Sequence, residues 1–522
     1  MPWRWLLAYV AATFFAFPQP LGATFVLDLG LVLAPVAPAL LLLALRGLTP
    51  GRAAWVGFSA GWLAHAALLH WAYVVTVTYG HAPVIAGLLA PFGMSLYIAP
   101  FIAGFAWVAA LLAQRGLANP FALAAAWVTF EWLRSWVLTG FGWGTLGYAW
   151  HENLALVPLA GTTGVYGLSF AASLLGFSAL AWRWPFAGAP NPRAARVGAA
   201  VVAGMHLFAS PLWIDPRSDV PLIRVAALQG NIDQGQKWSL AAFEETLLAY
   251  EDLTRRAAAD RAQLIVWPET AVPASLAYPE LRDRIASLAR EVRTPLIVGA
   301  VGIDFDANGE PVRFYDSAFV FSHEGVLLDR YDKTHLVPFG EYLPLRPLLG
   351  QLIRAVATGA TPNDVSPGER PRAIDIPLAN GQTVRVGIPI CYELIFPDLV
   401  RRFKEDGAEL LVGITNDAWY GRTGSPYQFL AMTALRSAET RLAGVRAANT
   451  GVSAHIDYAG RVSARTRIFE RTLVVDDVVL AGVWKGRSFF YADYGDVFAY
   501  ACTAATVLCS LIAVHRGRNK TS

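Results

Sequence analysis

Long apolar runs fill the first 215 residues and constrain the fold more than any other feature of the sequence. A bilayer-spanning helix needs about 20 mostly apolar residues, because its backbone hydrogen bonds close within the helix while its side chains meet lipid. We therefore expect a membrane domain of about seven transmembrane helices in residues 1–215, and a final transmembrane helix within residues 495–522. The runs lie near 5–20, 23–45, 53–75, 84–112, 120–138, 163–182, 197–213 and 497–514.

Charged residues are concentrated in the remaining part of the chain. Of 39 acidic and 42 basic residues in the 522-residue sequence, only three acidic and eight basic ones precede residue 211. The chain as a whole is 16% charged, whereas soluble domains carry about 25%. Its formal net charge of +3 excludes a nucleic-acid-binding protein that relies on a strong basic field. Residues 220–490 are therefore expected to form a separate polar domain.

The basic residues also predict how the apolar runs are oriented, since short cytoplasmic loops retain Lys and Arg. Arg4 places the N-terminus in the cytoplasm, and the basic tail after residue 514 belongs there too. The connection at 139–162 contains no Lys or Arg and is expected outside, as is the whole 220–490 domain. The other basic residues that this alternation places inside are Arg46, Arg52, Arg115, Arg183, Arg193 and Arg196.

Two features of the apolar half leave alternatives open. The first run could be a cleaved signal peptide, but Pro18-Gln19-Pro20 stands where small residues would be expected, so an uncleaved span is favoured. Glu131 and Arg134 are spaced to pair on one helix face. Charges at membrane depth are costly and often functional, although a pair that only stabilises the bundle is the more ordinary explanation.

From residue 222 the pattern changes to short β-branched runs separated by amphipathic segments. Strands that alternate with helices indicate an α/β domain, here of about 270 residues, large enough to bury its own core. The expected strands are 223–229, 263–267, 296–301, 317–321, 383–390, 409–415 and 452–457. The expected helices are 239–260, 279–293, 396–405 and 426–442.

Cys391 is the most informative residue of this domain. It ends an apolar strand and precedes a turn into a helix expected near Phe396. A helix N-terminus favours the thiolate, which is the form that attacks carbonyl groups. A free cysteine is also often a small core residue. The only other cysteines, Cys502 and Cys509, lie in the last apolar run, so a structural disulfide with Cys391 is not expected.

Two further segments place ionisable side chains where a nucleophile would need them. Glu269 follows the apolar stretch Leu264 to Pro268, and Lys333 and Glu341 lie in a loop stiffened by Pro and Gly. A nucleophile requires a base and a group that stabilises the developing oxyanion. Taken singly, Glu269 is more simply a surface acid and Lys333 a solvated charge.

Together these segments resemble the nitrilase superfamily, whose Glu-Lys-Cys triad occurs in this chain order on an α-β-β-α sandwich. A nitrilase-like domain that follows several membrane spans and precedes one more is similar to the apolipoprotein N-acyltransferase family, the membrane-embedded branch of that superfamily. The segments that carry the resemblance are Gln229-Gly230-Asn231 through Lys237-Trp238, Lys333 to Pro344, Cys391-Tyr392-Glu393, Thr415 to Gly421, and Arg446 to Gly451.

The resemblance implies a role for each matching residue. Glu269 would be the general base, Lys333 the cation that stabilises the oxyanion, and Cys391 the nucleophile. Glu341 matches a further essential carboxylate. Tyr392 and Glu393 match the residues that flank the nucleophile. Trp238 matches a tryptophan on a mobile loop over the site. The alternative is that Trp238 is simply an exposed aromatic residue after Lys237, since the sequence pattern is the same in both cases.

The resemblance also implies the reaction and its partners. A phospholipid would donate an acyl chain to Cys391, and the N-terminal amino group of a diacylated apolipoprotein would accept it, at the periplasmic face of a bacterial inner membrane. No metal or cofactor is implied, and His residues show no ligand spacing. One alternative is a membrane-anchored amidase that uses water as acceptor. Another is a transporter or lipid-binding protein whose polar domain is only a scaffold.

Overall fold

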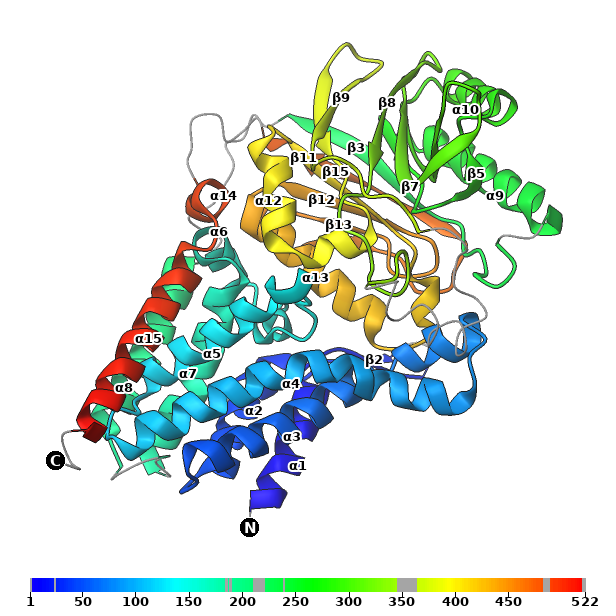
Figure 1. Ribbon diagram of the computed structural model, residues 1–522. Coiled ribbons are helices and arrows are strands. Elements are labelled where there is room, and N and C mark those ends of the chain that lie inside the picture. The colour runs from blue at the N-terminus through cyan, green and yellow to red at the C-terminus, as the bar shows by residue number, and fades with distance from the viewer. Residues whose placement is uncertain are drawn as a thin grey trace.

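The computed structural model separates into a helical half and a half built from two sheets (Figure 1). It describes residues 2–22, 25–183, 186, 190–209, 221–237, 240–344, 364–481 and 489–518. Helix α1 (Pro2–Phe15) begins and helix α15 (Val497–Arg518) ends at the same end of the helical half, away from the sheets. The fold is a helical bundle joined to an α/β sandwich, as the sequence predicts.

Each expected apolar run contains one helix of the bundle. Between α1 and α15 the bundle comprises α2 (Gly30–Leu45), α3 (Pro50–Leu68), the π-helix η1 (Val74–Tyr79), α4 (Val84–Gln114), α5 (Pro120–Arg134), α7 (Val165–Arg183) and α8 (Pro192–Ala209). Among the described residues, three helices are long and apolar enough to cross a membrane: Val84–Gln114, Val165–Arg183 and Val497–Gly517. Helix α5 begins at a side-chain cap, where Asn119 accepts hydrogen bonds from the Phe121 and Ala122 amides.

The run expected at 23–45 becomes helical later than its hydropathy suggests. Strands β1 (Gln19–Leu21) and β2 (Phe25–Leu27) form an antiparallel pair before the helix. Asp28 then accepts a hydrogen bond of 2.9 Å from the Gly30 amide, where α2 begins. Strand pairing and this cap satisfy backbone groups that a longer helix would have used.

Short helical turns connect α5 to α7 across the face of the bundle that meets the sandwich. They are η2 (Val137–Thr139), η3 (Leu146–Trp150), η4 (Val157–Leu159) and α6 (Ala160–Thr163). Glu131 accepts a 2.8 Å hydrogen bond from the Leu146 amide, and Arg134 donates to the Trp143 carbonyl and the Thr145 hydroxyl, each at 3.1 Å. These contacts agree with the interpretation that the two charges stabilise the bundle, here by anchoring this connection.

Two facing sheets form the sandwich. One has the strand order β15-β3-β4-β6-β7-β8, with β5 paired to β6, and the other has the order β14-β13-β12-β11-β10-β9. In each sheet three central strands run parallel and the flanking strands antiparallel. The first sheet contains β3 (Leu222–Gln229), β4 (Leu264–Val266), β5 (Val272–Ser275), β6 (Leu296–Phe305), β7 (Pro311–Phe321), β8 (Leu327–Asp332) and β15 (Thr472–Val479). The second contains β9 (Ala373–Pro377), β10 (Thr383–Gly387), β11 (Leu410–Thr415), β12 (Ala443–Ala448), β13 (Ala454–Ile456) and β14 (Val462–Arg465).

Strand β3 illustrates how the sequence builds this double layer. Ile223, Val225 and Ala227 belong to the core that includes the second sheet, whereas Ala226 and Leu228 belong to the core beneath the outer helices. Successive side chains of a strand point to opposite faces, so a strand buried on both faces is apolar at consecutive positions. This is why the 223–229 run lacks polar alternation.

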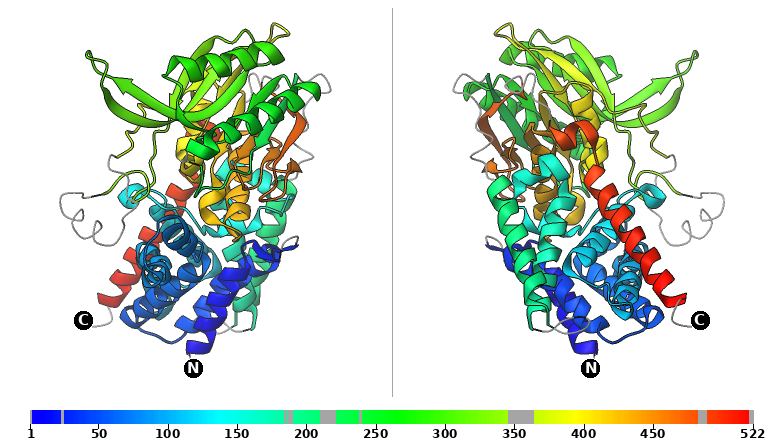
Figure 2. Two further views of the ribbon diagram at one scale, coloured as in Figure 1. Left: turned by 90° about the vertical axis from the view of Figure 1, so that its right-hand side faces the viewer. Right: turned by 90° about the vertical axis from the view of Figure 1, so that its left-hand side faces the viewer.

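Helices cover both outer faces of the sandwich (Figures 1 and 2). Helices α9 (Leu240–Ala259) and α10 (Pro279–Val292) cover the first sheet, and α12 (Pro397–Glu405) and α13 (Ser425–Thr440) the second. Helix α13 lies between its sheet and the bundle, where Trp143 donates to Gln428 at 2.8 Å and Glu439 accepts from the Val165 amide at 2.9 Å. The sandwich is therefore attached to the bundle by buried polar contacts.

Candidate active site

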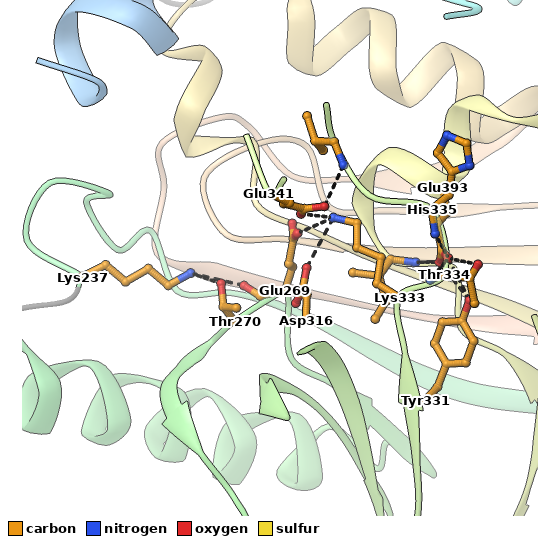
Figure 3. A network of polar contacts seen from close by, with 12 residues as sticks. Lys237, Glu269, Thr270, Asp316, Tyr331, Lys333, Thr334, His335, Glu341 and Glu393 are labelled. Atoms are coloured by element: carbon orange, nitrogen blue, oxygen red, sulfur yellow. Dashed lines mark hydrogen bonds and ion pairs between the residues drawn. The ribbon is translucent and has the colours of Figure 1, made fainter. Parts of the chain in front are cut away.

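The candidate residues Glu269 and Lys333 lie together beside Glu341, with their side chains pointing toward one another (Figure 3). Glu269 follows β4 and Lys333 follows β8, so strand ends of the first sheet supply both. The Lys333 ammonium is fully buried and lies 3.4 Å from a Glu269 oxygen. It also contacts Glu341 at 2.5 Å and Asp316 at 3.4 Å. A buried ammonium requires such partners.

Asp316, on β7, is a member of this cluster that the sequence patterns do not reveal. Burial and the neighbouring Glu269 carboxylate raise the pKa of Asp316 well above its usual value, which favours the neutral form of this carboxyl group. Burial also raises the pKa of Glu269, but Lys333 and hydrogen bonds with Asp316 and Cys391 outweigh it and leave the pKa below its usual value. The cluster thus places Glu269, whose ionised form is favoured, next to Asp316, whose neutral form is favoured.

Cys391 lies at the point where the second sheet meets this cluster. It is buried and begins the 3₁₀ turn η6 (Cys391–Ile395), with a φ of +48° that a side chain rarely adopts. Burial and the Glu269 charge raise the pKa of the thiol well above 9. The expectation that a helix N-terminus favours the thiolate is therefore wrong for the resting site, because burial and adjacent carboxylates outweigh it. The thiol needs a base to become nucleophilic.

Glu393 connects the Cys391 turn to the Lys333 segment. Its carboxylate accepts from the Ile390 amide at 2.8 Å, just before Cys391. It also accepts from the Thr334 amide and hydroxyl, both at 2.7 Å, just after Lys333. The Tyr331 hydroxyl donates to the same carboxylate at 2.9 Å (Figure 3). Glu393 thus fixes two backbone segments from different sheets relative to each other.

Tyr392 and Glu341 extend the site toward the bundle and across the Lys333 loop. The Tyr392 hydroxyl lies 3.5 Å from the Gly140 carbonyl, in the connection between α5 and α7. Glu341 contacts Lys333 with one carboxylate oxygen and accepts from the Val337 amide at 2.8 Å with the other. All the candidate residues of the sequence except Trp238 are therefore brought together, since Trp238 lies outside the described residues.

Comparison with known proteins identifies both halves of the chain. Residues 224–487 match the model of the carbon-nitrogen hydrolase family, and residues 11–178 match that of the apolipoprotein N-acyltransferase N-terminal domain. An apolipoprotein N-acyltransferase of Geobacter metallireducens is 39% identical over 93% of this chain and 91% of its own length. One from Methylococcus capsulatus is 35% identical over 94% of this chain and 93% of its own.

This chain belongs to the apolipoprotein N-acyltransferase family. Solved structures similar to its sandwich are more distant. An amidase from Nesterenkonia sp. is 20% identical, with a TM-score of 0.36, over 49% of this chain and 90% of its own. The C. elegans NitFhit protein is 18% identical, with a TM-score of 0.40, over 54% of this chain and 65% of its own.

In this member of the apolipoprotein N-acyltransferase family, the Thr415 to Gly421 segment places aromatic rings between the site and the bundle. Tyr420, in η7 (Asp417–Tyr420), packs against Trp71 with ring centroids 4.9 Å apart and against Trp143 at 5.9 Å. The neighbouring Trp419 contacts Tyr79 at 5.7 Å. Burial raises the pKa of the Tyr420 hydroxyl well above its usual value, and Cys391 and Asp417 are among the groups that interact with it, so this aromatic layer adjoins the site.

The three acidic residues of the candidate site also have the geometry of a metal-binding group. Oxygens of Glu269, Asp316 and Glu341 lie within 4.8 Å of one another. The Lys333 ammonium, however, contacts all three carboxyl groups. The chain itself therefore supplies the cation that these acids require, and the arrangement is suited to acid–base and oxyanion chemistry.

Proposed function

We propose that this chain transfers an acyl chain from a phospholipid to the N-terminal α-amino group of the S-diacylglyceryl cysteine of apolipoproteins. The transfer proceeds by a ping-pong mechanism through a thioester on Cys391. The observation that carries the proposal is the buried group of a thiol, an ionised carboxylate and an ammonium, in a sandwich attached to an apolar helical bundle. Membership of the family supports the same reaction.

The first half-reaction acylates the cysteine. Glu269 takes the thiol proton, and the Cys391 sulfur attacks the ester carbonyl carbon of the phospholipid. The Lys333 charge stabilises the oxyanion of the tetrahedral intermediate. The ester C–O bond then breaks, and Glu269 returns its proton to the leaving oxygen. Lysophospholipid is released, and the acyl chain remains on Cys391 as a thioester.

The second half-reaction uses the same groups. The neutral α-amino group attacks the thioester carbonyl carbon, and Glu269 accepts the proton that the nitrogen loses. The C–S bond breaks, and the sulfur regains a proton from Glu269. The product is an amide, and the cysteine returns to its thiol form. The raised pKa of Asp316 favours its neutral form, so we assign both proton transfers to Glu269.

A lipid donor also suits the surface around the site. Leu138 and Phe339 are 83% and 67% exposed, in the connection that reaches Tyr392 and in the loop that carries Glu341. Exposed apolar side chains of this size favour contact with lipid over water. Each buried CH₂ contributes about 0.8 kcal/mol, so a site that extracted both lipids fully into water would be heavily penalised. We place the sandwich at the periplasmic face of the inner membrane, with both termini in the cytoplasm.

A membrane-anchored amidase with the same three residues is the alternative, since it differs only in using water as the second acceptor. The test is mass spectrometry of the Cys391 peptide after incubation of the purified protein with phospholipid. Acylated Cys391 that passes its chain to an added diacylated lipopeptide is the expected result. Release of free fatty acid without N-acyl lipopeptide would establish the hydrolase instead. No acyl group on Cys391 would refute the mechanism.

A further inference from the structure

A second lysine, Lys237, is buried beside the site with 1% of its surface exposed. It precedes α9 and is not one of the residues assigned to the triad. Its ammonium donates to the Thr270 hydroxyl at 2.6 Å and to the Glu269 backbone carbonyl at 3.3 Å (Figure 3). Both acceptors belong to the turn that carries the Glu269 side chain into the cluster.

This turn is strained and tightly packed. Thr270 has a φ of +44°, a region that β-branched residues avoid. A Cβ at Gly299 would lie 2.1 Å from the Pro268 carbonyl oxygen and 2.8 Å from the Glu269 Cα. Strained backbone persists where the surrounding structure holds it. Lys237 and the closely packed Gly299 backbone are two such restraints.

The charge of Lys237 also acts on the reacting groups. The ionisable groups that face it are Glu269 after β4, Asp316 on β7 and Cys391 in η6. Burial lowers the pKa of Lys237 to about 8, against the opposing effect of Glu269. The anions on the reacting groups that its charge can stabilise are the Glu269 carboxylate and the Cys391 thiolate.

We propose that Lys237 is a positioning residue whose ammonium holds the Glu269 turn and supplies a second positive charge to the base and the thiol. This inference rests on the proposed roles of Glu269 and Cys391. The inference predicts in which direction the pKa of the Cys391 thiol changes when the Lys237 charge is removed. A nearby cation lowers the pKa of the thiol, so loss of the Lys237 charge raises it and slows attack by the sulfur at neutral pH. A purely structural lysine would leave the ionisation of Cys391 unchanged.

The test measures Cys391 ionisation without using the acyl reaction. The full-length protein is treated with iodoacetamide from pH 6 to 10, and the alkylated Cys391 peptide is quantified by mass spectrometry. K237Q is expected to move the pH profile about one unit toward alkaline pH, and to slow alkylation about tenfold at pH 7. K237R keeps the charge and is expected to react like the wild type at pH 7. K404Q, at another partly buried lysine of the sandwich, is the matched control.

A second comparison keeps the inference testable if K237Q does not fold. The wild type loses the Lys237 charge above about pH 8, whereas the arginine of K237R stays charged. The rate of Cys391 alkylation in K237R, divided by the rate in the wild type, is therefore expected to rise between pH 7 and pH 9. A constant ratio would overturn the inference, as would a K237Q profile that matches wild type. If these shifts occur but phospholipid never acylates Cys391, the inference about Lys237 stands and the proposed acyl transfer fails.

Discussion

Glu393 accepts hydrogen bonds from both the amide and the hydroxyl of Thr334, each at 2.7 Å, and Thr334 directly follows Lys333. The same carboxylate accepts from the Ile390 amide, which directly precedes Cys391. One side chain therefore sets the distance between the cation and the nucleophile. Its position next to Cys391 in the sequence does not by itself reveal this.

We expect E393Q to lower the rate of Cys391 acylation by about 100-fold, because an amide nitrogen would face backbone donors and displace one segment. The measurement is the rate of acyl-Cys391 formation from phospholipid, followed by mass spectrometry. E405Q, on the same side of the sandwich but in an exposed pair with Arg401, is the control and is expected to react like wild type. An E393Q rate within twofold of wild type would refute this role.

The pH dependence of acylation should reflect Glu269 and Cys391 together. The pKa of Glu269 lies below 4.5, so the base remains ionised at neutral pH and activity declines only as the pH falls through that lower value. The pKa of the thiol lies well above 9, so without a base Cys391 acylation in E269Q should be about 10²- to 10⁴-fold slower at pH 7. The acylation rate of E269Q should increase as the pH rises toward the pKa of the thiol. A flat E269Q profile between pH 7 and 10 would contradict this assignment.

Asp316 should be replaceable by its neutral analogue. Its pKa is raised above the unfolded value of 3.8, so its contribution to stability is complete below about pH 4 and is lost as the pH rises through the folded pKa. D316N cannot ionise and should gain in melting temperature relative to wild type between pH 5 and pH 8. D316A, which removes a partner of Lys333, should be less stable than either across this range. The melting temperatures of all three proteins are measured by thermal unfolding in detergent.

Gly451 should not tolerate a side chain. A Cβ there would lie 1.8 Å from a carboxylate oxygen of Asp417, which pairs with Arg446 at 2.8 Å in the fully buried core of the sandwich. Disrupting a buried pair costs about 3–5 kcal/mol. G451A should therefore lower the melting temperature markedly, whereas G204A, where nothing lies within 4 Å, should not. Equal effects of the two substitutions would argue against the geometry of this ion pair.

Much of the fold can be predicted from the sequence because its periodicities are strong. All eight apolar runs contain helices, and the expected helices at 279–293 and 426–442 match α10 and α13 closely. The sandwich strands β5, β8, β9, β12, β14 and β15 were not predicted. Two of them show why: Ala443–Ala448 contains few large apolar residues, and Thr472–Val479 is interrupted by two aspartates. Pairing with neighbouring strands makes each of these two part of a sheet.

The sequence by itself predicts which residues could react, because Glu269 and Cys391 follow apolar stretches expected to form strands, and Lys333 lies in a loop stiffened by Pro and Gly. Only the tertiary structure decided which of their neighbours matter and in which protonation state. Asp316 lies within a strand and shows no pattern, yet burial beside Glu269 raises its pKa and favours its neutral form. The helix N-terminus near Cys391 was expected to favour the thiolate, but burial and neighbouring charges raise the pKa of the thiol, since the free energy of ionisation depends on burial and on charges brought together from distant parts of the chain.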